Sequence, residues 1–331
     1  MQTKPFGTTG LATTPLGLGL AALGRPGYIN LGHADDLNQN YDVAAMTAHT
    51  HRVLDAAWEA GIRYFDAARS YGRAEEFLAS WLIARDIQPD EVVVGSKWGY
   101  TYTAAWQIEA EHHEIKDHSL SVLQRQTRES LALLGPHLDL YQIHSATLDS
   151  GVLDNQPVLA ELARLQTELG LHIGLSLSGD NQSETLYRAL ELAETGFRFD
   201  SVQATWNLLE QSAAPALQAA HEAGWAVIVK EVLANGRLTP RNDDPNFAEQ
   251  RLQLGQIALA KNSSIDALAI AAALAQPWAT VVLSGAATVE HVASNAAALK
   301  VAWDEATAES LTNLIEDPAV YWHTRSQLAW N

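Results

Sequence analysis

Four polar residues that can move or stabilise a proton lie in the first half of the chain. Asp66 and Tyr71 occur in the stretch GIRYFDAARSYG, Lys97 ends the run EVVVGSK, and His144 ends the run LDLYQIH. A free tyrosine has a pKa of about 10, so it is a poor proton donor at neutral pH. A nearby ammonium lowers that pKa by stabilising the phenolate. These residue types predict a site where Tyr71 gives a proton to a carbonyl oxygen.

Each of the other three residues has an expected role beside Tyr71. Lys97 supplies the positive charge, Asp66 holds Lys97 protonated and oriented, and His144 hydrogen-bonds a substrate oxygen. No side chain can deliver a hydride, so the reduction requires a redox cofactor. A structural interpretation is also open for each residue alone: a loop cap for the aspartate, a solvated lysine, and a core histidine.

Short apolar runs alternate with amphipathic helical stretches along most of the chain, and the candidate residues lie at or near the ends of three such runs. The predicted strands are 15–23, 62–68, 91–97, 138–144, 172–178, 201–206, 226–232 and 280–285. Eight strand-then-helix units predict an α/β fold, a closed (β/α)8 TIM barrel, in which the C-terminal strand ends meet at one mouth. An open doubly wound sheet is the alternative.

The segments outside these units also have expected places. Residues 2–14 are expected to form a small β-hairpin that plugs the bottom of the barrel, and residues 305–317 a further helix near the C-terminus. Within the barrel, 44–61 and 157–170 are expected helices, and each ends in glycine as helix C-termini commonly do. No linker composition is present, so residues 1–331 are expected to form a single domain.

Composition excludes several classes of function. The chain has 331 residues, 47% of them hydrophobic, with 21 Lys and Arg against 39 Asp and Glu, a net charge of −18. This charge repels a phosphate backbone, so nucleic acid and anionic membrane surfaces are not expected partners. Because there is no cysteine, disulfides and thiolate metal sites are excluded. With no membrane span and no signal peptide expected, the sequence predicts a soluble cytoplasmic protein.

One glycine-rich stretch imitates a nucleotide-binding motif. Gly17, Gly19 and Ala22 match the pattern G-x-G-x-x-A, which binds dinucleotides when a helix opens inside it. Here Gly24 and Pro26 follow instead, and no helix is expected to start. We therefore do not interpret this stretch as a Rossmann motif.

Four separated stretches together resemble the aldo-keto reductase family. They are GIRYFDAARSYG, VVVGSKWG, SLALLGPHLDLYQIHS and SVQATWNLLEQ, in the order found in that family, and the resemblance covers nearly the whole chain. It implies a barrel that reduces carbonyls with a nicotinamide cofactor, and it matches the family's catalytic residues to Asp66, Tyr71, Lys97 and His144. The expected partner is a small-molecule carbonyl; the oligomeric state is not predicted.

The resemblance also implies where the nicotinamide is held. Ser176 and Gln203 match the residues that bind its carboxamide, but Leu177 stands where relatives have asparagine, so Ser178 or Asn207 is a possible substitute. Lys230 occupies the position of an aromatic residue that stacks on the nicotinamide in many relatives. Two tryptophans are candidate walls of the substrate pocket, Trp98 beside Lys97, and Trp206, which is also a possible replacement for that aromatic residue.

The other end of the cofactor is expected near the last strand. Gly285 leads into a helix that starts near Thr288, and free amide groups at a helix N-terminus bind phosphate. The resemblance implies an adenosine-phosphate site here, with Asn295 toward the adenine and with Leu233 and Gly236 also near the cofactor. Relatives that prefer NADP(H) usually have arginine where this chain has His291. Family habit thus favours NADP(H), whereas the histidine favours NAD(H) or dual use.

Other functions have weaker support in the sequence. His112, His113 and His118 match no standard metal spacing, so we interpret 109–119 as a surface loop and expect no metal. A barrel glycosidase needs two carboxylates about 5 to 9.5 Å apart, and Glu231 has no evident partner. The main prediction is an NAD(P)H-dependent reductase of an aldehyde, ketone or sugar carbonyl (EC 1.1.1.-). The alternatives are an NAD-linked sugar dehydrogenase and a nicotinamide-binding regulatory barrel with little turnover.

Overall fold

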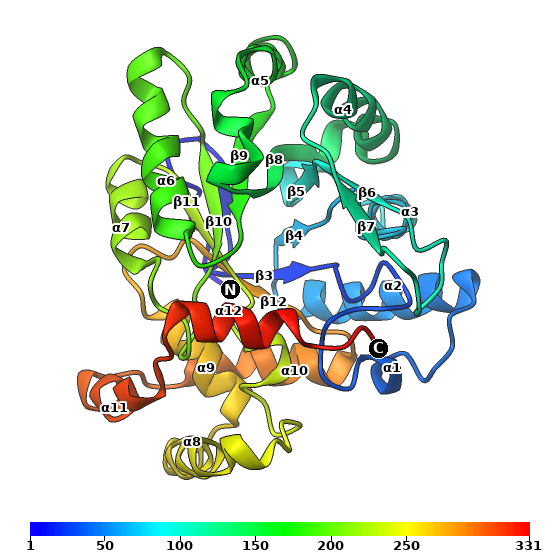
Figure 1. The fold of residues 1–331 in the computed structure, drawn as a ribbon. Coiled ribbons are helices and arrows are strands. Elements are labelled where there is room, and N and C mark those ends of the chain that lie inside the picture. The colour runs from blue at the N-terminus through cyan, green and yellow to red at the C-terminus, as the bar shows by residue number, and fades with distance from the viewer.

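The computed structural model describes all residues 1–331 and contains a closed barrel of eight parallel strands (Figure 1). In barrel order the strands are β3 (Leu16–Gly19), β4 (Tyr64–Asp66), β5 (Val93–Trp98), β8 (Leu138–Ala146), β9 (His172–Leu177), β10 (Ser201–Thr205), β11 (Ala226–Lys230) and β12 (Val281–Ser284). Because β12 pairs with β3, the sheet has no open edge. The predicted TIM barrel is confirmed, and the alternative of an open sheet is wrong.

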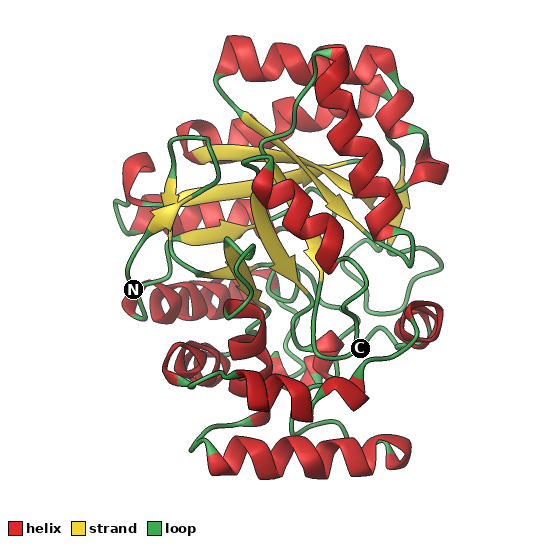
Figure 2. Cartoon of the chain, turned by 90° about the vertical axis from the view of Figure 1, so that its left-hand side faces the viewer, coloured by secondary structure: helices red, strands yellow, loops and turns green.

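Helices surround the strands, as the view turned by 90° shows (Figure 2). They are α2 (Val43–Glu59), α3 (Ala74–Ala84), α4 (Leu120–Leu134), α5 (Gln156–Leu169), α6 (Gln182–Glu191), α7 (Ala214–Glu222), α8 (Ala248–Ala260), α9 (Ile265–Leu274) and α10 (Val289–Ala297). Strands covered on both faces need apolar side chains throughout, which explains the continuous apolar runs of the sequence. Ser119 caps α4 by accepting a hydrogen bond from Val122 N at 3.4 Å.

An N-terminal hairpin closes the bottom of the barrel. It consists of β1 (Lys4–Pro5) and β2 (Ala12–Thr13), which pair in antiparallel fashion. Between them Phe6 is fully buried, and its ring stacks on that of Tyr64 with centroids 5.8 Å apart. Phe6 belongs to a cluster of eight buried hydrophobic residues contributed by the barrel strands and the hairpin. The predicted plug is therefore confirmed.

Four features differ from the expected elements. The segment after Lys97 is a two-stranded hairpin, β6 (Tyr100–Tyr102) with β7 (Glu114–Lys116), instead of a plain surface loop. The helix expected over 305–317 is shorter, α11 (Glu305–Ser310), with a single 3-10 turn after it. A last helix, α12 (Pro318–Ser326), and a short α1 (His33–Asp36) were not predicted. In Figure 1, α12 lies in front of the barrel strands.

No helix of the chain is by itself long and apolar enough to cross a bilayer. One pair, Pro245–Ala260 and Ile265–Leu274, reaches the required length and hydropathy together, with a bend of 79° between its members.

Candidate active site

A cavity of about 710 Å³ lies at the mouth of the barrel. Tyr71 and His144 line it at one end, and His291 and Asn295 of α10 line it at the other. The mouth is formed by the C-terminal ends of the strands, where TIM barrels hold their active sites. The four predicted catalytic residues come from β4, the loop after it, β5 and β8, so the barrel brings them to one place.

Lys97 is the centre of this group. Its ammonium is ion-paired with Asp66 and donates a hydrogen bond to Ala67 O at 3.0 Å. The same nitrogen lies 3.4 Å from the hydroxyl oxygen of Tyr71. The side chains of Lys97 and Asp66 are 0% and 2% exposed, so the pair is shielded from water. Asp66 also accepts a hydrogen bond from Gln203 Nε2 at 3.0 Å.

His144 faces Tyr71 from β8. The two rings meet edge to face with centroids 5.4 Å apart, and His144 Nδ1 lies 3.3 Å from the hydroxyl of Ser70. Burial, together with the charge of Lys97, lowers the pKa of His144 well below its ordinary value. The imidazole is therefore neutral at physiological pH, and one of its nitrogens can donate a hydrogen bond to a substrate oxygen.

The pKa of Tyr71 differs from the expectation. Burial and the charge of Asp66 raise this pKa well above its ordinary value, so the predicted lowering by Lys97 is wrong for this cavity. The largest cause is burial of the phenol, and the Lys97 ammonium, whose charge is paired with Asp66, does not offset it. Tyr71 thus keeps its proton at neutral pH and presents it beside an ammonium group.

A second cation packs against Tyr71. The Arg25 guanidinium carbon is 5.3 Å from the Tyr71 ring centroid and 4.8 Å from that of Trp330, and Arg25 pairs with Glu114 at 3.0 Å. His113 stacks on Trp330 with ring centroids 3.8 Å apart. The sequence alone does not predict this group, because its members come from three distant segments. In the sequence, this group is indicated by the aromatic residues around GRPGY and near the C-terminus.

Both tryptophans predicted as pocket walls lie elsewhere. Trp98 is fully buried and packs its ring against His118 with centroids 5.6 Å apart. Trp206 packs against Trp278 and lines a separate cavity of about 200 Å³. Neither lines the large cavity, so their assignment to its wall is wrong, and Trp206 does not replace the missing aromatic residue. Tyr100, two residues after Trp98, lines the cavity instead.

The residues expected near the nicotinamide carboxamide mostly face the cavity. Ser176, Ser178 and Gln203 line it, and Ser176 Oγ accepts a hydrogen bond from Ser145 N at 2.8 Å. Asn207 does not line it, because its amide nitrogen donates to Glu231 O at 3.0 Å and to the Tyr321 hydroxyl at 2.9 Å. The suggestion that Asn207 replaces the missing asparagine is therefore wrong.

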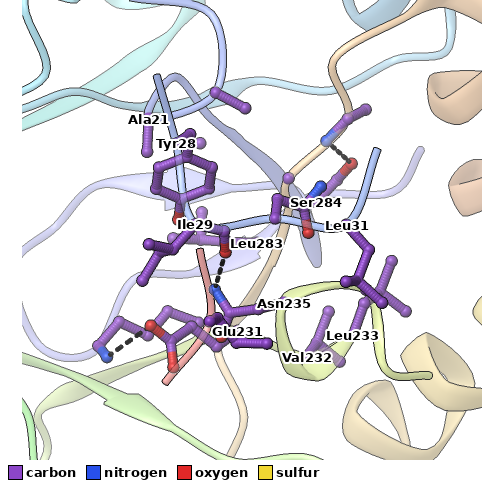
Figure 3. Close-up of a pocket in the computed structure, with 18 of the residues that line it drawn as sticks. Ala21, Tyr28, Ile29, Leu31, Glu231, Val232, Leu233, Asn235, Leu283 and Ser284 are labelled. Atoms are coloured by element: carbon purple, nitrogen blue, oxygen red, sulfur yellow. Dashed lines mark hydrogen bonds and ion pairs between the residues drawn. The ribbon is translucent and has the colours of Figure 1, made fainter. Parts of the chain in front are cut away.

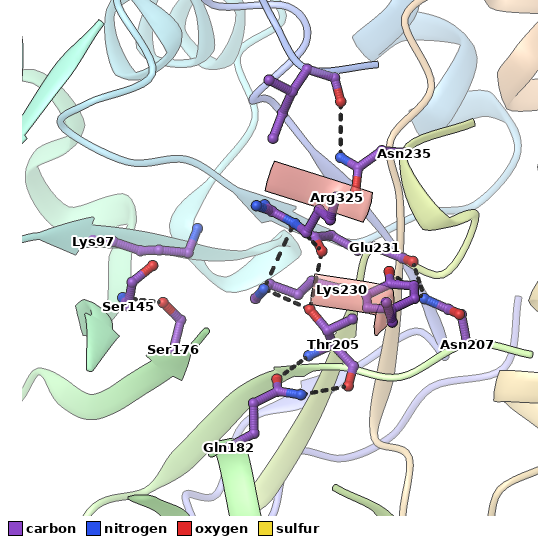
Figure 4. A network of polar contacts seen from close by, with 12 residues as sticks. Lys97, Ser145, Ser176, Gln182, Thr205, Asn207, Lys230, Glu231, Asn235 and Arg325 are labelled. Carbon is purple, nitrogen blue, oxygen red and sulfur yellow. Dashed lines mark hydrogen bonds and ion pairs between the residues drawn. The ribbon is translucent and has the colours of Figure 1, made fainter. Parts of the chain in front are cut away.

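Polar residues at and just after the C-terminal ends of β10 and β11 form a network at the cavity wall (Figure 4). Lys230 donates to the Thr205 hydroxyl at 2.8 Å and lies 3.8 Å from Glu231. Arg325 of α12 donates from Nε to both oxygens of Glu231, at 3.0 and 2.9 Å. Burial alone would raise the pKa of Glu231, but Arg325 and Lys230 lower it to about 2, so this carboxylate is charged.

The far end of the cavity is built around α10. Gly285 lines it, and a Cβ placed there would meet no protein atom within 4 Å, so the backbone is open to the cavity. His291 lies 3.8 Å from Asp36, which also pairs with Arg241. Thr288 is the N-cap of α10 and accepts from His291 N at 3.2 Å. Thr288 does not line the cavity, which corrects its placement among the cofactor contacts.

Asn295 lines the cavity, but its amide is bonded inside the protein. Its oxygen accepts from the Ser284 hydroxyl at 2.8 Å, and its nitrogen donates to Asp266 at 3.2 Å and to His291 O at 3.3 Å.

Two loops meet across the middle of the cavity (Figure 3). Asn235, after β11, donates from its amide to Ile29 O at 2.9 Å, and Leu31 N donates to Asn235 O at 3.2 Å. Leu233 and Gly236 line the cavity on the same side. The cavity of about 710 Å³ thus has polar side chains in its wall beside two joined loops, and its volume is in the range of cofactor pockets.

The three histidines of 109–119 have separate environments. His112 is 68% exposed, His113 donates to Ile108 O at 2.7 Å, and His118 donates to His144 O at 2.9 Å. No cluster of three or more potential ligands able to hold a metal occurs in the chain.

Comparison with known proteins identifies the family. A model of the aldo/keto reductase family matches residues 15–316. Pyridoxal 4-dehydrogenase of Microbacterium luteolum is 29% identical over 164 residues, an alignment that spans only 43% of this chain and 43% of that protein. Aldo-keto reductase str7 of Strobilurus tenacellus is 22% identical over 329 residues, covering 92% of this chain and 88% of that protein.

A solved structure supports the same fold. Aldo-keto reductase AKR11C1 from Bacillus halodurans, in its holo form, superposes with a TM-score of 0.73 at 22% identity, covering 98% of this chain and 99% of that one. The family match, the barrel and the residues gathered at its mouth agree. The chain therefore belongs to the aldo/keto reductase family, whose members reduce small-molecule carbonyls with nicotinamide cofactors.

Proposed function

We propose that this protein transfers a hydride between a nicotinamide cofactor and an aldehyde, ketone or sugar carbonyl, with Tyr71 as the general acid. The observation that carries the proposal is the 3.4 Å separation of the Tyr71 hydroxyl from the Lys97 ammonium at the end of the cavity. A protonated phenol beside a buried cation can give up its proton at the moment a carbonyl oxygen gains charge.

The remaining residues prepare that proton transfer. Asp66 keeps Lys97 in place, so that the ammonium stabilises the phenolate that Tyr71 becomes after donating its proton. Neutral His144 donates a hydrogen bond to the same carbonyl oxygen, and Ser70 orients the imidazole through Nδ1. The nicotinamide, when bound, supplies the hydride that no side chain can provide.

We further propose how the chain holds the cofactor. Ser176 and Gln203 would bind the carboxamide next to Asp66, and Leu233, Gly236 and Gly285 would lie along the diphosphate. The open backbone at Gly285 supports this assignment, because phosphate oxygens bind exposed amide groups before a helix. The adenosine would lie at α10.

The charges at the α10 end favour NAD(H) over NADP(H), contrary to the family habit. Glu290 and Asp266 line the cavity there together with Arg241 and His291, and the charge of Arg241 is paired with the buried Asp36. A 2′-phosphate would meet the carboxylates of Glu290 and Asp266, whereas a ribose hydroxyl can donate hydrogen bonds to them.

The oxidative direction is a second candidate. The similarity to a protein named pyridoxal 4-dehydrogenase supports it, although that alignment covers less than half of either chain. In this direction Tyr71 would first have to lose the proton that it carries at neutral pH, and its phenolate would then accept the proton of an alcohol. A regulatory barrel without turnover has less support, because all four catalytic positions are filled and gathered at the cavity.

Fluorescence titration with NADH and NADPH, followed by turnover of a panel of reactive aldehydes, tests the proposal. We expect binding of at least one cofactor, with NADH favoured, and cofactor oxidation that depends on added aldehyde. Binding without turnover of any aldehyde, and without reduction of NAD⁺ by the corresponding alcohols, would support the regulatory alternative. No binding of either cofactor would contradict the proposal.

A further inference from the structure

Lys230 is a buried cation in the cavity wall that the proposed proton transfer does not use. Its ammonium hydrogen-bonds a neutral group, the Thr205 hydroxyl at 2.8 Å, and is 3.8 Å from its nearest carboxylate, Glu231. That carboxylate is already bound through both oxygens by Arg325. Two cations therefore share one anion, and this part of the wall carries a net positive charge.

The groups facing Lys230 from other elements do not cancel this charge. Lys97 of β5 and Asp66 of β4 neutralise each other as a buried ion pair. His144 of β8 is uncharged, because burial and Lys97 lower its pKa. Burial also lowers the pKa of Lys230 to about 8, so most molecules carry this ammonium at pH 7.

The sheet register places Lys230 beside the residues proposed for the nicotinamide. Gln203 pairs with Ser176 on one side and with Ile228 on the other, and Thr205 pairs with Lys230. Lys230 is thus two residues nearer the mouth than the level of Gln203, on the neighbouring strand. Figure 4 shows Lys230 beside Thr205, and Ser176 beside Ser145 in a separate group with Lys97 to the left.

We propose that Lys230 selects the redox state of the bound cofactor by disfavouring the oxidised form, whose nicotinamide ring carries a positive charge. The inference rests on the proposed function. Like charges repel at short range inside a protein, whereas the neutral reduced ring meets no such penalty. A protein favours one form of a ligand over another only when its free energy of interaction differs between the two forms.

This selection has a consequence for the direction of the reaction. In the oxidation of an alcohol the bound cofactor would take a hydride from the alcohol carbon, and the hydroxyl proton would pass to the Tyr71 phenolate once Tyr71 had lost its own proton to solvent. Because the ring loses its charge in that step, Lys230 favours hydride acceptance on the enzyme. The same repulsion weakens binding of the oxidised cofactor and leaves that of the reduced cofactor unchanged.

Dissociation constants of NAD⁺ and NADH, measured by titration calorimetry, test the inference in four proteins: the parent chain, Lys230→Met, Lys230→Arg and Lys116→Met. In the parent chain we expect NADH to bind more tightly. The ratio of the dissociation constant of NAD⁺ to that of NADH should fall by about tenfold in Lys230→Met, because the substitution removes a like charge near the oxidised ring. Lys230→Arg keeps the charge and should keep the ratio. Lys116→Met removes a lysine outside the cavity and should also leave it unchanged.

A pH series gives an independent readout should Lys230→Met fail to fold. The ratio in the parent chain should decrease between pH 7 and about 9.5 as Lys230 loses its proton. A ratio that stays constant with pH, or that is the same in Lys230→Met, would overturn the inference while leaving the proposed function intact. If the parent chain bound neither NAD⁺ nor NADH, and neither NADP⁺ nor NADPH, both the inference and the proposed function would be overturned.

Discussion

The hydroxyl oxygen of Tyr71 lies 3.4 Å from the ammonium nitrogen of Lys97, whose partner in a buried ion pair is Asp66. The phenol is thus held protonated by burial and by Asp66, yet its conjugate base would form beside a cation. This arrangement suits a proton donor that acts only when a carbonyl oxygen becomes negatively charged.

Tyr71→Phe should reduce turnover by at least about a hundredfold, because it removes the general acid and leaves the ring in place. Cofactor affinity should change little, since Tyr71 is at the substrate end of the cavity. Steady-state kinetics with a reactive aldehyde and a parallel fluorescence titration measure the two effects. Full activity in this variant would show that the proton comes from another group.

Asp66→Asn should destabilise the fold by roughly 3 to 5 kcal/mol, because it leaves the buried Lys97 ammonium without its counterion. Urea unfolding followed by circular dichroism measures this loss. The matched control is Glu76→Gln, which breaks an exposed ion pair with Arg73 and should change stability little. Equal effects of the two substitutions would contradict the account of the Asp66–Lys97 pair.

Acid should destabilise the fold partly through His118. Burial lowers the pKa of its imidazole to about 4, so the unfolded chain, with a pKa of about 6.5, binds a proton more readily. The contribution of His118 to the free energy of unfolding is therefore fully present above pH 6.5. It falls as the pH decreases toward 4, by about 3 kcal/mol. The lowered pKa of His33 also makes the fold less stable in acid, whereas the raised pKa of Asp139 makes it more stable in acid.

Comparing the parent chain with His118→Gln separates this contribution, because the other groups titrate in both proteins. The difference in unfolding free energy between the two should shrink as the pH falls from 7 to about 4. His112→Gln, which changes an exposed histidine, is the control and should leave the pH dependence unaltered. A pH-independent difference for His118→Gln would refute this assignment.

Trp330→Ala should raise KM for the substrate by roughly threefold to tenfold and affect cofactor binding less. Trp330 lines the cavity, stacks on His113 and lies 4.8 Å from the Arg25 guanidinium, so it shapes the substrate end. Contacts of this kind contribute on the order of 1 kcal/mol each. Trp303→Ala, which opens the separate smaller cavity, is the control. If the substitution changed only the affinity for the cofactor, the assignment of Trp330 to the substrate end of the cavity would be contradicted.

The sequence was sufficient to predict the barrel and the gathering of Asp66, Tyr71, Lys97 and His144. Strands buried on both faces appear as apolar runs, and eight such runs separated by helices have few arrangements other than closure. Once the strands close, their C-terminal ends share one mouth. The positions of Asp66, Lys97 and His144 follow from this topology, whereas that of Tyr71 also depends on the loop after β4.

Residues whose positions depend on long-range packing could not be predicted. The contacts of Trp330 with Arg25 and His113 join the last residues to two loops, and no local pattern specifies them. The pKa of Tyr71 depends on how deeply it is buried and on the pairing of Lys97. The error at Trp98 was avoidable: adjacent residues of a strand point to opposite faces, so the neighbour of an inward Lys97 points outward.

Deuterium transfer tests the central claim most directly. NADH carrying deuterium at either of the two C4 positions would be incubated separately with the protein and 4-nitrobenzaldehyde, and the alcohol product analysed by mass spectrometry. The account predicts one deuterium on the alcohol carbon from one of the two labelled cofactors, and a strong loss of product with Tyr71→Phe. Alcohol formed without deuterium from either cofactor, or no alcohol with any carbonyl under conditions where the cofactor is bound, would contradict it.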